Sequence, residues 1–192
     1  MCGIVGLVQR FDPHARLDLT PFTATRAALQ TWTADGADAA DRLLEAARAV
    51  EGPSRGLVGW AGFRALRERP TAKDDIKSLA QRLRGAAEAV DARLADAAAL
   101  ASSSEGEALS RGAVAARDVA WRLTEDALAN VVAIEALRGG GEDPGPKGWF
   151  ELWRLNMVLN QLGRLEVRGR DSGGLATLIV LDKDAWAAAH GV

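Results

Sequence analysis

The strongest constraint on the fold is a heptad-like repeat of apolar residues between positions 71 and 138. Such a repeat requires amphipathic helices that pair along an apolar seam. Before the break SSSEGE the two seam rows are Ile76, Leu83, Val90 and Ala97, and Ala80, Ala87, Leu94 and Ala101. After it they are Leu109, Ala116, Leu123 and Leu137, and Ala113, Ala120, Ala127 and Ile134. The pattern predicts an antiparallel helical hairpin that turns near residues 102–106 and packs closely through its alanines.

Two polar features refine this hairpin. Ser104 and Glu107 have the spacing of a capping box, which predicts the start of the second helix. Asn130 interrupts one apolar row, and a polar residue at such a position can set the register of paired helices.

The residues before the hairpin also favour helices. Thr20 and Pro21 suit an N-cap followed by proline in the first turn, which predicts a short helix to about Trp32. A second helix is expected over 38–50 and should end at Gly52-Pro53. Three glycines between 54 and 69 weaken a helix there, or allow another helix to approach closely. We expect the side chains of Trp32, Trp60 and Trp121 to pack rather than to stack on a ligand.

A glycine- and proline-rich linker, 139–148, precedes a helix expected over 149–165. The predicted apolar face of that helix consists of Leu152, Leu155, Leu159 and Leu162. Apolar runs at 3–8 and 175–182 favour short buried strands at the two ends of the chain. The expected fold class is therefore mainly α with a small β part, that is α+β.

Composition limits the function classes. The chain has 192 residues, a net charge of -2 and a single cysteine, so neither bulk attraction to nucleic acid or acidic membranes nor an internal disulfide is expected. It has no basic, apolar start typical of a secretory signal and no apolar run long enough to span a bilayer. We therefore expect a cytoplasmic protein.

The single cysteine, Cys2, becomes the N-terminal residue if Met1 is removed. Its α-amino group, with an ordinary pKa of about 7.7–8.0, can then act as the base for its own thiol. The alternatives are a small buried core residue and a site of lipid attachment. His14 and His190 occupy no persuasive position for a base and are expected to be incidental.

The stretch MCGIVG, together with RLEVRGRDSGG, resembles the class II glutamine amidotransferases, which are N-terminal-nucleophile hydrolases. The pair is most similar to glutamine–fructose-6-phosphate aminotransferases (glucosamine-6-phosphate synthases), whose second motif is close to RLEYRGYDSAG. The matching positions are Arg164, Leu165, Glu166, Arg168, Gly169, Asp171, Ser172 and Gly174. Val167, Arg170 and Gly173 depart from that pattern.

The resemblance implies that Cys2 attacks the glutamine amide and that the released ammonia passes to fructose 6-phosphate. Arg168 and Gly169 would position the nucleophile or bind substrate, and Asp171 and Ser172 would stabilise the turn. A turn-stabilising ion pair is the alternative role for Arg168. No cofactor and no metal are implied, and the partners are L-glutamine and a sugar phosphate, with no nucleic acid or membrane.

The resemblance also implies a domain organisation. Residues 1–9 and 149–192 would form a partial amidotransferase core of two strands and one helix, interrupted by a helical insertion over 10–138 and the linker. The Asn-Gly and Thr-Arg-Trp elements typical of the family are missing. We therefore expect the N-terminal part of a longer amidotransferase, inactive in isolation without C-terminal amidotransferase and phosphosugar-binding domains. The alternative is a non-catalytic helical interaction module that retains amidotransferase remnants and oligomerises through its helices.

Overall fold

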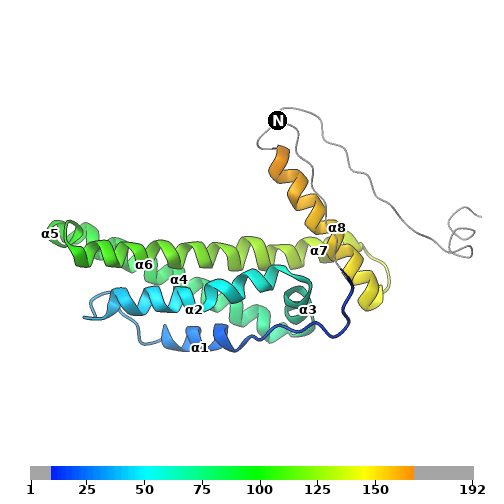
Figure 1. Cartoon of the computed structure of the whole chain (residues 1–192), viewed down its shortest axis with the longest axis horizontal. Helices are drawn as coiled ribbons and strands as arrows, with labels where there is room; N and C mark the ends of the chain where they lie inside the picture. The colour runs from blue at the N-terminus through cyan, green and yellow to red at the C-terminus, as the bar shows by residue number, and fades with distance from the viewer. Residues whose placement is uncertain (1–9, 167–192) are drawn as a thin grey trace, which may run out of the picture. The chain divides into compact units, whose positions relative to one another are not determined.

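The computed structural model describes residues 10–166 of the chain. The chain divides into two compact units, Leu7–Met157 and Met1–Gly6 with Val158–Val192. The described elements, shown in Figure 1, are α1 Thr20–Ala28, α2 Ala39–Val58, α3 Trp60–Glu68, α4 Pro70–Asp96, α5 Ala98–Ala101, α6 Ser104–Trp121, the π-helix η1 Arg122–Leu128, α7 Ala129–Arg138 and α8 Gly145–Glu166. Helix α8 contributes residues 145–157 to the larger unit and 158–166 to the smaller one.

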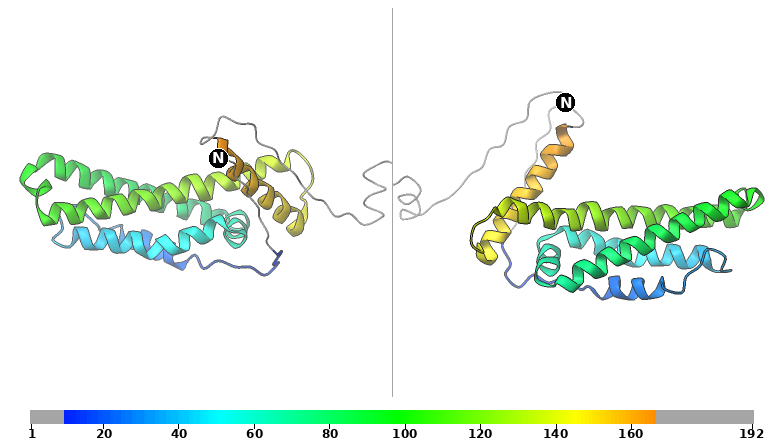
Figure 2. Two further views of the ribbon diagram at one scale, coloured as in Figure 1. Left: turned by 45° about the horizontal axis from the view of Figure 1, so that its top comes forward. Right: turned by 180° about the vertical axis from the view of Figure 1, so that it is seen from behind.

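The predicted helical hairpin is present in the larger unit. Helix α4 forms one arm, and α6, η1 and α7 follow one another without a break to form the other, which lies alongside α4 in Figures 1 and 2. Leu83 and Ala87 of α4 and Leu109 and Ala116 of α6 are completely buried. Because alanine side chains are short, the two arms can approach closely along this seam.

The connection between the arms covers residues 97–103 and includes α5, so it begins before the turn predicted at 102–106. The cap of the second arm differs from the prediction by one residue. Ser103, not Ser104, is the N-cap of α6, and its hydroxyl oxygen accepts a hydrogen bond from the Gly106 backbone N–H at 3.1 Å. The predicted capping box of Ser104 with Glu107 is therefore wrong. A Cβ atom at Gly106 would lie 2.1 Å from the Leu100 carbonyl oxygen, so the tightness of the turn requires glycine there.

The π-helix η1 changes the register of the second arm. A π-turn holds more residues than an α-turn, so the buried row after Leu123 continues through Ala127, Val131 and Ile134. The predicted row through Asn130 and Leu137 is displaced, because Asn130 is half-buried and Leu137 is exposed. The Thr124 hydroxyl lies 3.1 Å from the Ala120 carbonyl oxygen and 3.2 Å from that of Trp121, and so satisfies backbone groups at the start of η1.

Helix α2 continues through Gly52-Pro53, where the sequence predicted a break. The buried side chains Leu43, Val50 and Leu57 form one face that extends past the proline and packs against α6. The Ser54 hydroxyl donates to the Glu51 carbonyl oxygen at 2.7 Å, and Arg122 Nη1 donates to the Ser54 oxygen at 3.2 Å. Burial on both sides of Pro53 therefore outweighs the cost of a proline inside the helix.

The start of α1 also differs by one residue from the prediction. Thr20 is the first helical residue and not the N-cap, which is Leu19. The Asp18 carboxylate accepts a hydrogen bond from the Thr20 backbone N–H at 2.9 Å, and this bond lowers the pKa of Asp18. Pro21 lies in the first turn of the helix, as predicted.

Glycines between α2 and α3 allow the end of α2 and the start of α3 to pack closely. Gly59 separates the two helices, and a Cβ atom at Gly62 would lie 2.3 Å from the Leu57 Cα atom. The segment that packs closely against Gly62 is therefore the end of α2. Despite the three glycines, helices occupy most of residues 54–69.

Helix α8 buries a different face from the one predicted. Its buried side chains are Trp149, Phe150, Trp153 and Asn156. On the predicted leucine face, Leu159 is 38% exposed and Leu152 is only partly buried. Both sets recur at helical spacing, and the larger aromatic side chains remove more apolar surface from water when they are buried.

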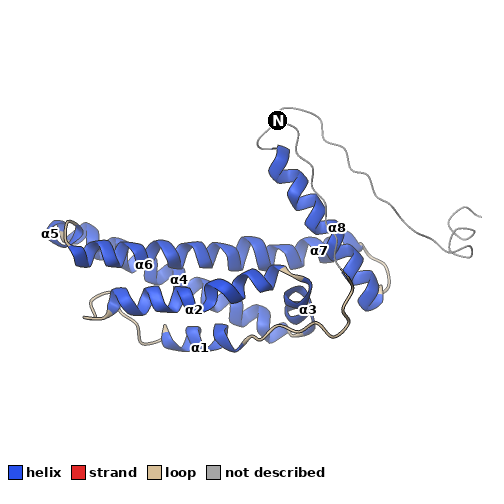
Figure 3. Cartoon of the chain, in the orientation of Figure 1, coloured by secondary structure: helices blue, strands red, loops and turns tan. Residues whose placement is uncertain are grey.

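The predicted α+β fold class is wrong, whereas its mainly helical part is correct. Figure 3 shows helices, turns and loops but no strand over residues 10–166. These residues carry apolar side chains at helical spacing, so each helix buries its stripe against other helices and there is no sheet to cover. The two predicted strands, at 3–8 and 175–182, lie outside the described residues. None of the helices described over 10–166 has the length and apolarity needed to cross a membrane.

Candidate functional site

The residues predicted to form the active site lie outside the described part of the chain. Cys2 precedes it, and Arg168, Gly169, Asp171 and Ser172 follow it. The structure does describe the two segments that lead to these residues. One is the loop that begins at residue 10, and the other is α8, whose last residue, Glu166, stands two positions before Arg168.

These two segments meet in a cluster of aromatic rings, which we call the junction cluster. Its members are Phe11, Trp60, Phe63, Trp149, Phe150 and Trp153. The Phe11 ring centroid lies 5.3 Å from that of Phe150 and 6.0 Å from that of Trp60. Trp60 meets Phe150 edge to face at 5.2 Å. These separations are typical of favourable aromatic pairs.

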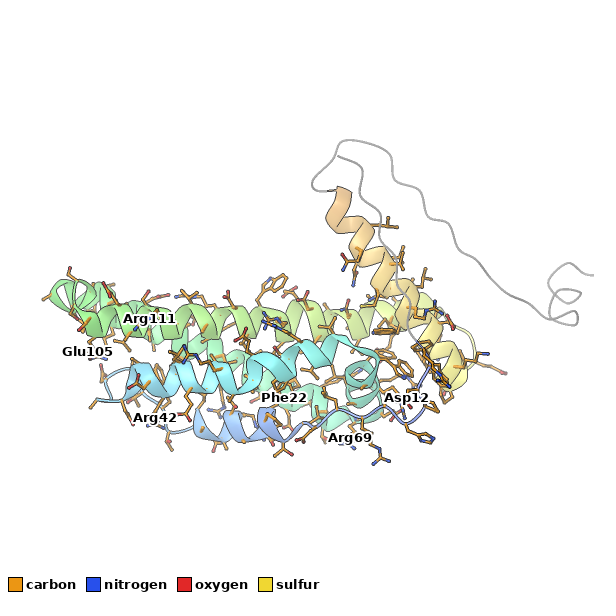
Figure 4. The ribbon with its side chains drawn as sticks, in the orientation of Figure 1. Asp12, Phe22, Arg42, Arg69, Glu105 and Arg111 are labelled. Carbon is orange, nitrogen blue, oxygen red and sulfur yellow. The ribbon has the colours of Figure 1, made fainter. Side chains whose placement is uncertain are left out.

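Hydrogen bonds from the indole groups fix the backbone around the cluster. Trp60 Nε1 donates to the Asp12 carbonyl oxygen at 2.9 Å, and Trp153 Nε1 donates to the Val58 carbonyl oxygen at 3.1 Å. Arg64 of α3 donates to the carbonyl oxygen of Pro13. Figure 4 shows Asp12 at the end of the bundle where α3 lies, far from Glu105 and Arg111 on α6. Helix α3 is therefore bonded to the N-terminal loop, and the end of α2, which precedes α3, is bonded to α8.

The exposed edge of the cluster carries charged groups that are already paired. The Arg67 guanidinium lies 4.1 Å from the Trp149 ring centroid and 3.4 Å from an Asp143 carboxylate oxygen. The Trp149 indole N–H donates to the same carboxylate, and this bond, assisted by the Gly145 N–H and the nearby arginines, lowers the pKa of Asp143. A cavity of about 80 Å³ lies here between α3 and the start of α8.

A hydrogen bond between two asparagines joins α8 to the hairpin. The buried Asn156 of α8 donates from Nδ2 to Asn130 Oδ1 of α7 at 3.0 Å. Asn130 in turn donates to the Asp126 carbonyl oxygen. The displacement of Asn130 from the apolar seam by the π-helix thus leaves it available to bond α8.

An open groove of about 990 Å³ lies along α4. Small and apolar residues of α4, of α5 and of the segment after α1 line most of it, including Gly85, Ala89 and Leu100. Its Arg93 donates to the Ala34 carbonyl oxygen and to Glu105, the latter at 2.8 Å. Arg93, one of the charged residues that line the groove, therefore holds the loop after α1 against α4.

Over residues 10–166, no three histidine, cysteine, aspartate or glutamate side chains gather in a way that could hold a metal ion. His14 is exposed in the loop after Asp12. Among the tryptophans expected to pack, Trp60 is buried, but Trp121 is 53% exposed and does not fit that expectation.

The junction cluster was not predicted from the sequence. One local signal was available, because Trp149, Phe150 and Trp153 stand at positions i, i+1 and i+4 and so share one helix face. Their partners Phe11 and Trp60 lie far away in the sequence, and only the fold brings them together. Compared as a whole, the chain matches no protein-family model, no curated protein and no solved structure.

Proposed function

We propose that the chain supplies the N-terminal cysteine nucleophile of a class II glutamine amidotransferase that transfers ammonia from glutamine to fructose 6-phosphate. The observation that carries this proposal is the pair of motifs, MCGIVG at the start and RLEVRGRDSGG near the end, in the order in which that family has them. A reactive thiol of this kind remains reduced in the cytoplasm, where we place the protein.

The proposed reaction starts once Met1 has been removed. The free α-amino group of Cys2 takes the proton of its own thiol, and the thiolate attacks the side-chain amide carbon of glutamine. The C–N bond breaks, ammonia leaves with the proton, and a thioester remains on Cys2. Water then hydrolyses the thioester to glutamate and the free thiol. Arg168 offers fixed donors to carbonyl or carboxylate groups of the substrate, and Gly169 permits close backbone approach.

In this proposal the helical bundle is an insertion between the two motif-bearing segments. The first and last residues of an inserted domain must lie close together, because otherwise the insertion would separate host residues that are neighbours in the host fold. The 5.3 Å between the Phe11 and Phe150 rings supports this arrangement, because the chain enters and leaves the bundle at the same place. Further domains would bind the sugar phosphate.

One observation favours a second candidate, a helical module that binds another protein. Val114, Trp121 and Val132 expose 50%, 53% and 67% of their surface on the second arm of the hairpin. Large exposed apolar side chains are common where proteins associate, although isolated ones are also ordinary. This candidate requires neither removal of Met1 nor a reactive Cys2.

The test measures Cys2 directly. Intact mass of the purified chain shows whether Met1 is removed, and a glutamine analogue that carries a diazo ketone in place of the amide then labels the thiol. Labelling needs the nucleophile but not turnover, so it applies even to a chain that cannot complete the reaction. We expect Cys2 to react faster with this analogue than with a diazo ketone lacking the amino-acid group, and Arg168→Gln to reduce that preference.

Two controls sharpen the result. Cys2→Ser should abolish the adduct, and a chain with Met1 retained should react slowly because the thiol lacks its adjacent amine. Retention of Met1 in the natural chain, or equal reactivity of Cys2 toward the two diazo ketones, would contradict the amidotransferase proposal and favour the interaction module.

A further inference from the structure

The groove along α4 marks a face of that helix that the other described residues leave open. Helix α1 has nine residues and α4 has 27, so α4 continues past α1 toward α5 (Figures 1 and 2). Along the groove, small and charged residues recur three and four positions apart, which is the spacing by which helices pair. We call this set the outer face of α4: Arg82, Gly85, Ala89, Ala92 and Asp96. Ala89 is half-buried and the other four are exposed.

Gly85 is not required by the packing of the described chain. A Cβ atom added to it would meet no atom within 4 Å. It lies in the middle of α4, where glycine destabilises a helix relative to alanine because it loses more conformational freedom on folding. The absence of a side chain becomes useful if a further helix approaches the outer face closely.

The charges at the two ends of the outer face match a second copy of the same face that runs in the opposite direction. Arg82 and Asp96 stand seven residues before and after Ala89, so a two-fold axis near Ala89 brings Arg82 of each copy level with Asp96 of the other. Both line the groove, and neither forms an ion pair with another residue of the described chain. Arg93 and Asp35, which also line the groove, pair with each other at 3.7 Å. A parallel copy would instead place like charges together.

We propose that the outer face of α4 binds a second copy of this chain, with the two α4 helices antiparallel about a two-fold axis near Ala89. The contact extends over about 21 Å, which is the rise from Arg82 to Asp96. Small residues in the middle let the two helices approach closely, and one Arg82–Asp96 pair at each end sets their relative direction. This surface is separate from the exposed apolar residues of the second arm, and the inference does not rest on the proposed function.

The test measures self-association of the full chain by sedimentation over a range of concentrations, with a reducing agent to prevent disulfides between Cys2 residues. We expect a monomer–dimer equilibrium. Arg82→Glu removes both ion pairs and sets glutamates against aspartates, so it should weaken the dimer at least about tenfold, and Asp96→Arg should do the same. The matched control is Arg111→Glu, an equal change of charge at an exposed position of α6, which should leave association unchanged.

A mixture of the two single variants provides the rescue. One copy then carries two acidic end groups and the other carries two basic ones, so opposite charges meet again at both ends. We expect the mixture to associate about as strongly as the wild type, although each variant alone does not. Because Arg82 and Asp96 are exposed, neither change should disturb the fold of the monomer.

Gly85→Ala should change the stability of the monomer and the association in opposite directions. At concentrations at which the chain is monomeric, the melting temperature should rise because alanine favours the helix. The dimer should nevertheless weaken several-fold, because the added methyl group lies between the two helices. Gly52→Ala, in α2, is the control: its Cβ atom would also meet no atom within 4 Å, and it should leave association unchanged.

Three results would overturn the proposal. The first is a chain that stays monomeric up to about 1 mM. The second is a dimer that Arg82→Glu leaves as strong as the wild type, or that Val132→Asp on the second arm weakens while the α4 variants do not. The third is a mixture of the two single variants that fails to associate. None of these measurements depends on Cys2, so failure of this inference is distinguishable from failure of the proposed function.

Discussion

The seam of the hairpin and the junction cluster both join separate segments of the chain, but they do so with side chains of very different size. The seam joins α4 to α6 through many small side chains, such as Ala80, Ala87, Ala113 and Ala120, each of which buries little surface. The cluster joins loop, α3 and α8 through a few large rings, each of which can bury about 150–250 Å². The seam therefore depends on close approach along its whole length, whereas the cluster depends on individual residues.

This difference predicts where a single truncation does most damage. Trp60→Ala should lower the free energy of unfolding by about 3–5 kcal/mol, because it removes the ring that contacts four others and the indole N–H that donates to the Asp12 carbonyl oxygen. Chemical denaturation of the full chain measures the change. Trp121→Ala, which removes the same side chain from an exposed position, is the matched control and should change stability by less than about 0.5 kcal/mol. Equal effects of the two would show that the cluster does not concentrate stability.

The seam should be sensitive to enlargement instead. Ala87→Leu places three extra carbon atoms where α4 and α6 lie together, and we expect a loss of about 1–3 kcal/mol. Ala95→Leu makes the same change at an exposed position of the same helix and should be nearly neutral. Thermal unfolding followed by circular dichroism compares them. If Ala87→Leu were tolerated as well as Ala95→Leu, the two arms would be less closely packed than the structure indicates.

The hydroxyl by which the π-helix bonds the end of α6 offers a smaller perturbation. Thr124→Val keeps the shape of the side chain but removes the hydroxyl that bonds the Ala120 and Trp121 carbonyl oxygens and accepts from Arg84 at 2.6 Å. We expect a loss of about 1 kcal/mol. Thr124→Ser retains the hydroxyl and serves as the control in the same denaturation experiment. A valine variant as stable as the serine variant would mean that the hydroxyl does not stabilise η1.

The sequence predicted the regular part of this comparison better than the irregular part. The seven-residue repeat predicted the hairpin correctly, because many positions contribute to a periodic pattern, but the first arm ends at Asp96, before the predicted turn. The repeat did not reveal the π-helix η1. Ala127 and Ile134 are buried as predicted, but Val131 is buried in place of Asn130. The helix through Pro53 was missed for another reason: local preference opposes it, and only burial against α6 favours it.

The residues of the candidate site were harder to predict from the sequence than the helices. Its chemistry was predicted from two motifs alone, at positions outside the described residues, and those assignments stay predictions. The junction cluster could not be predicted, because Phe11 and Phe150 are far apart in the sequence and no periodic pattern links them. For α8, two faces of equal periodicity competed, and aromatic size, rather than spacing, decided which one is buried.

The weakest expected effect concerns the charged edge of the cluster. The Trp149 N–H, with the Gly145 N–H and the arginines, holds the pKa of Asp143 below its ordinary range, so the folded state binds this proton less readily than the unfolded state. The stabilisation is therefore complete above the ordinary pKa of aspartate, about 4, and is lost as the pH falls through the lower folded value. We expect Asp143→Asn to lower the melting temperature slightly at pH 7 and to have no effect once the pH is low enough to protonate Asp143 in the folded chain. Glu142→Gln controls for the change in net charge at the neighbouring position. A difference between the wild type and Asp143→Asn that persisted unchanged into strong acid would show that the carboxylate charge does not contribute, and that Trp149 is held by its ring contacts alone.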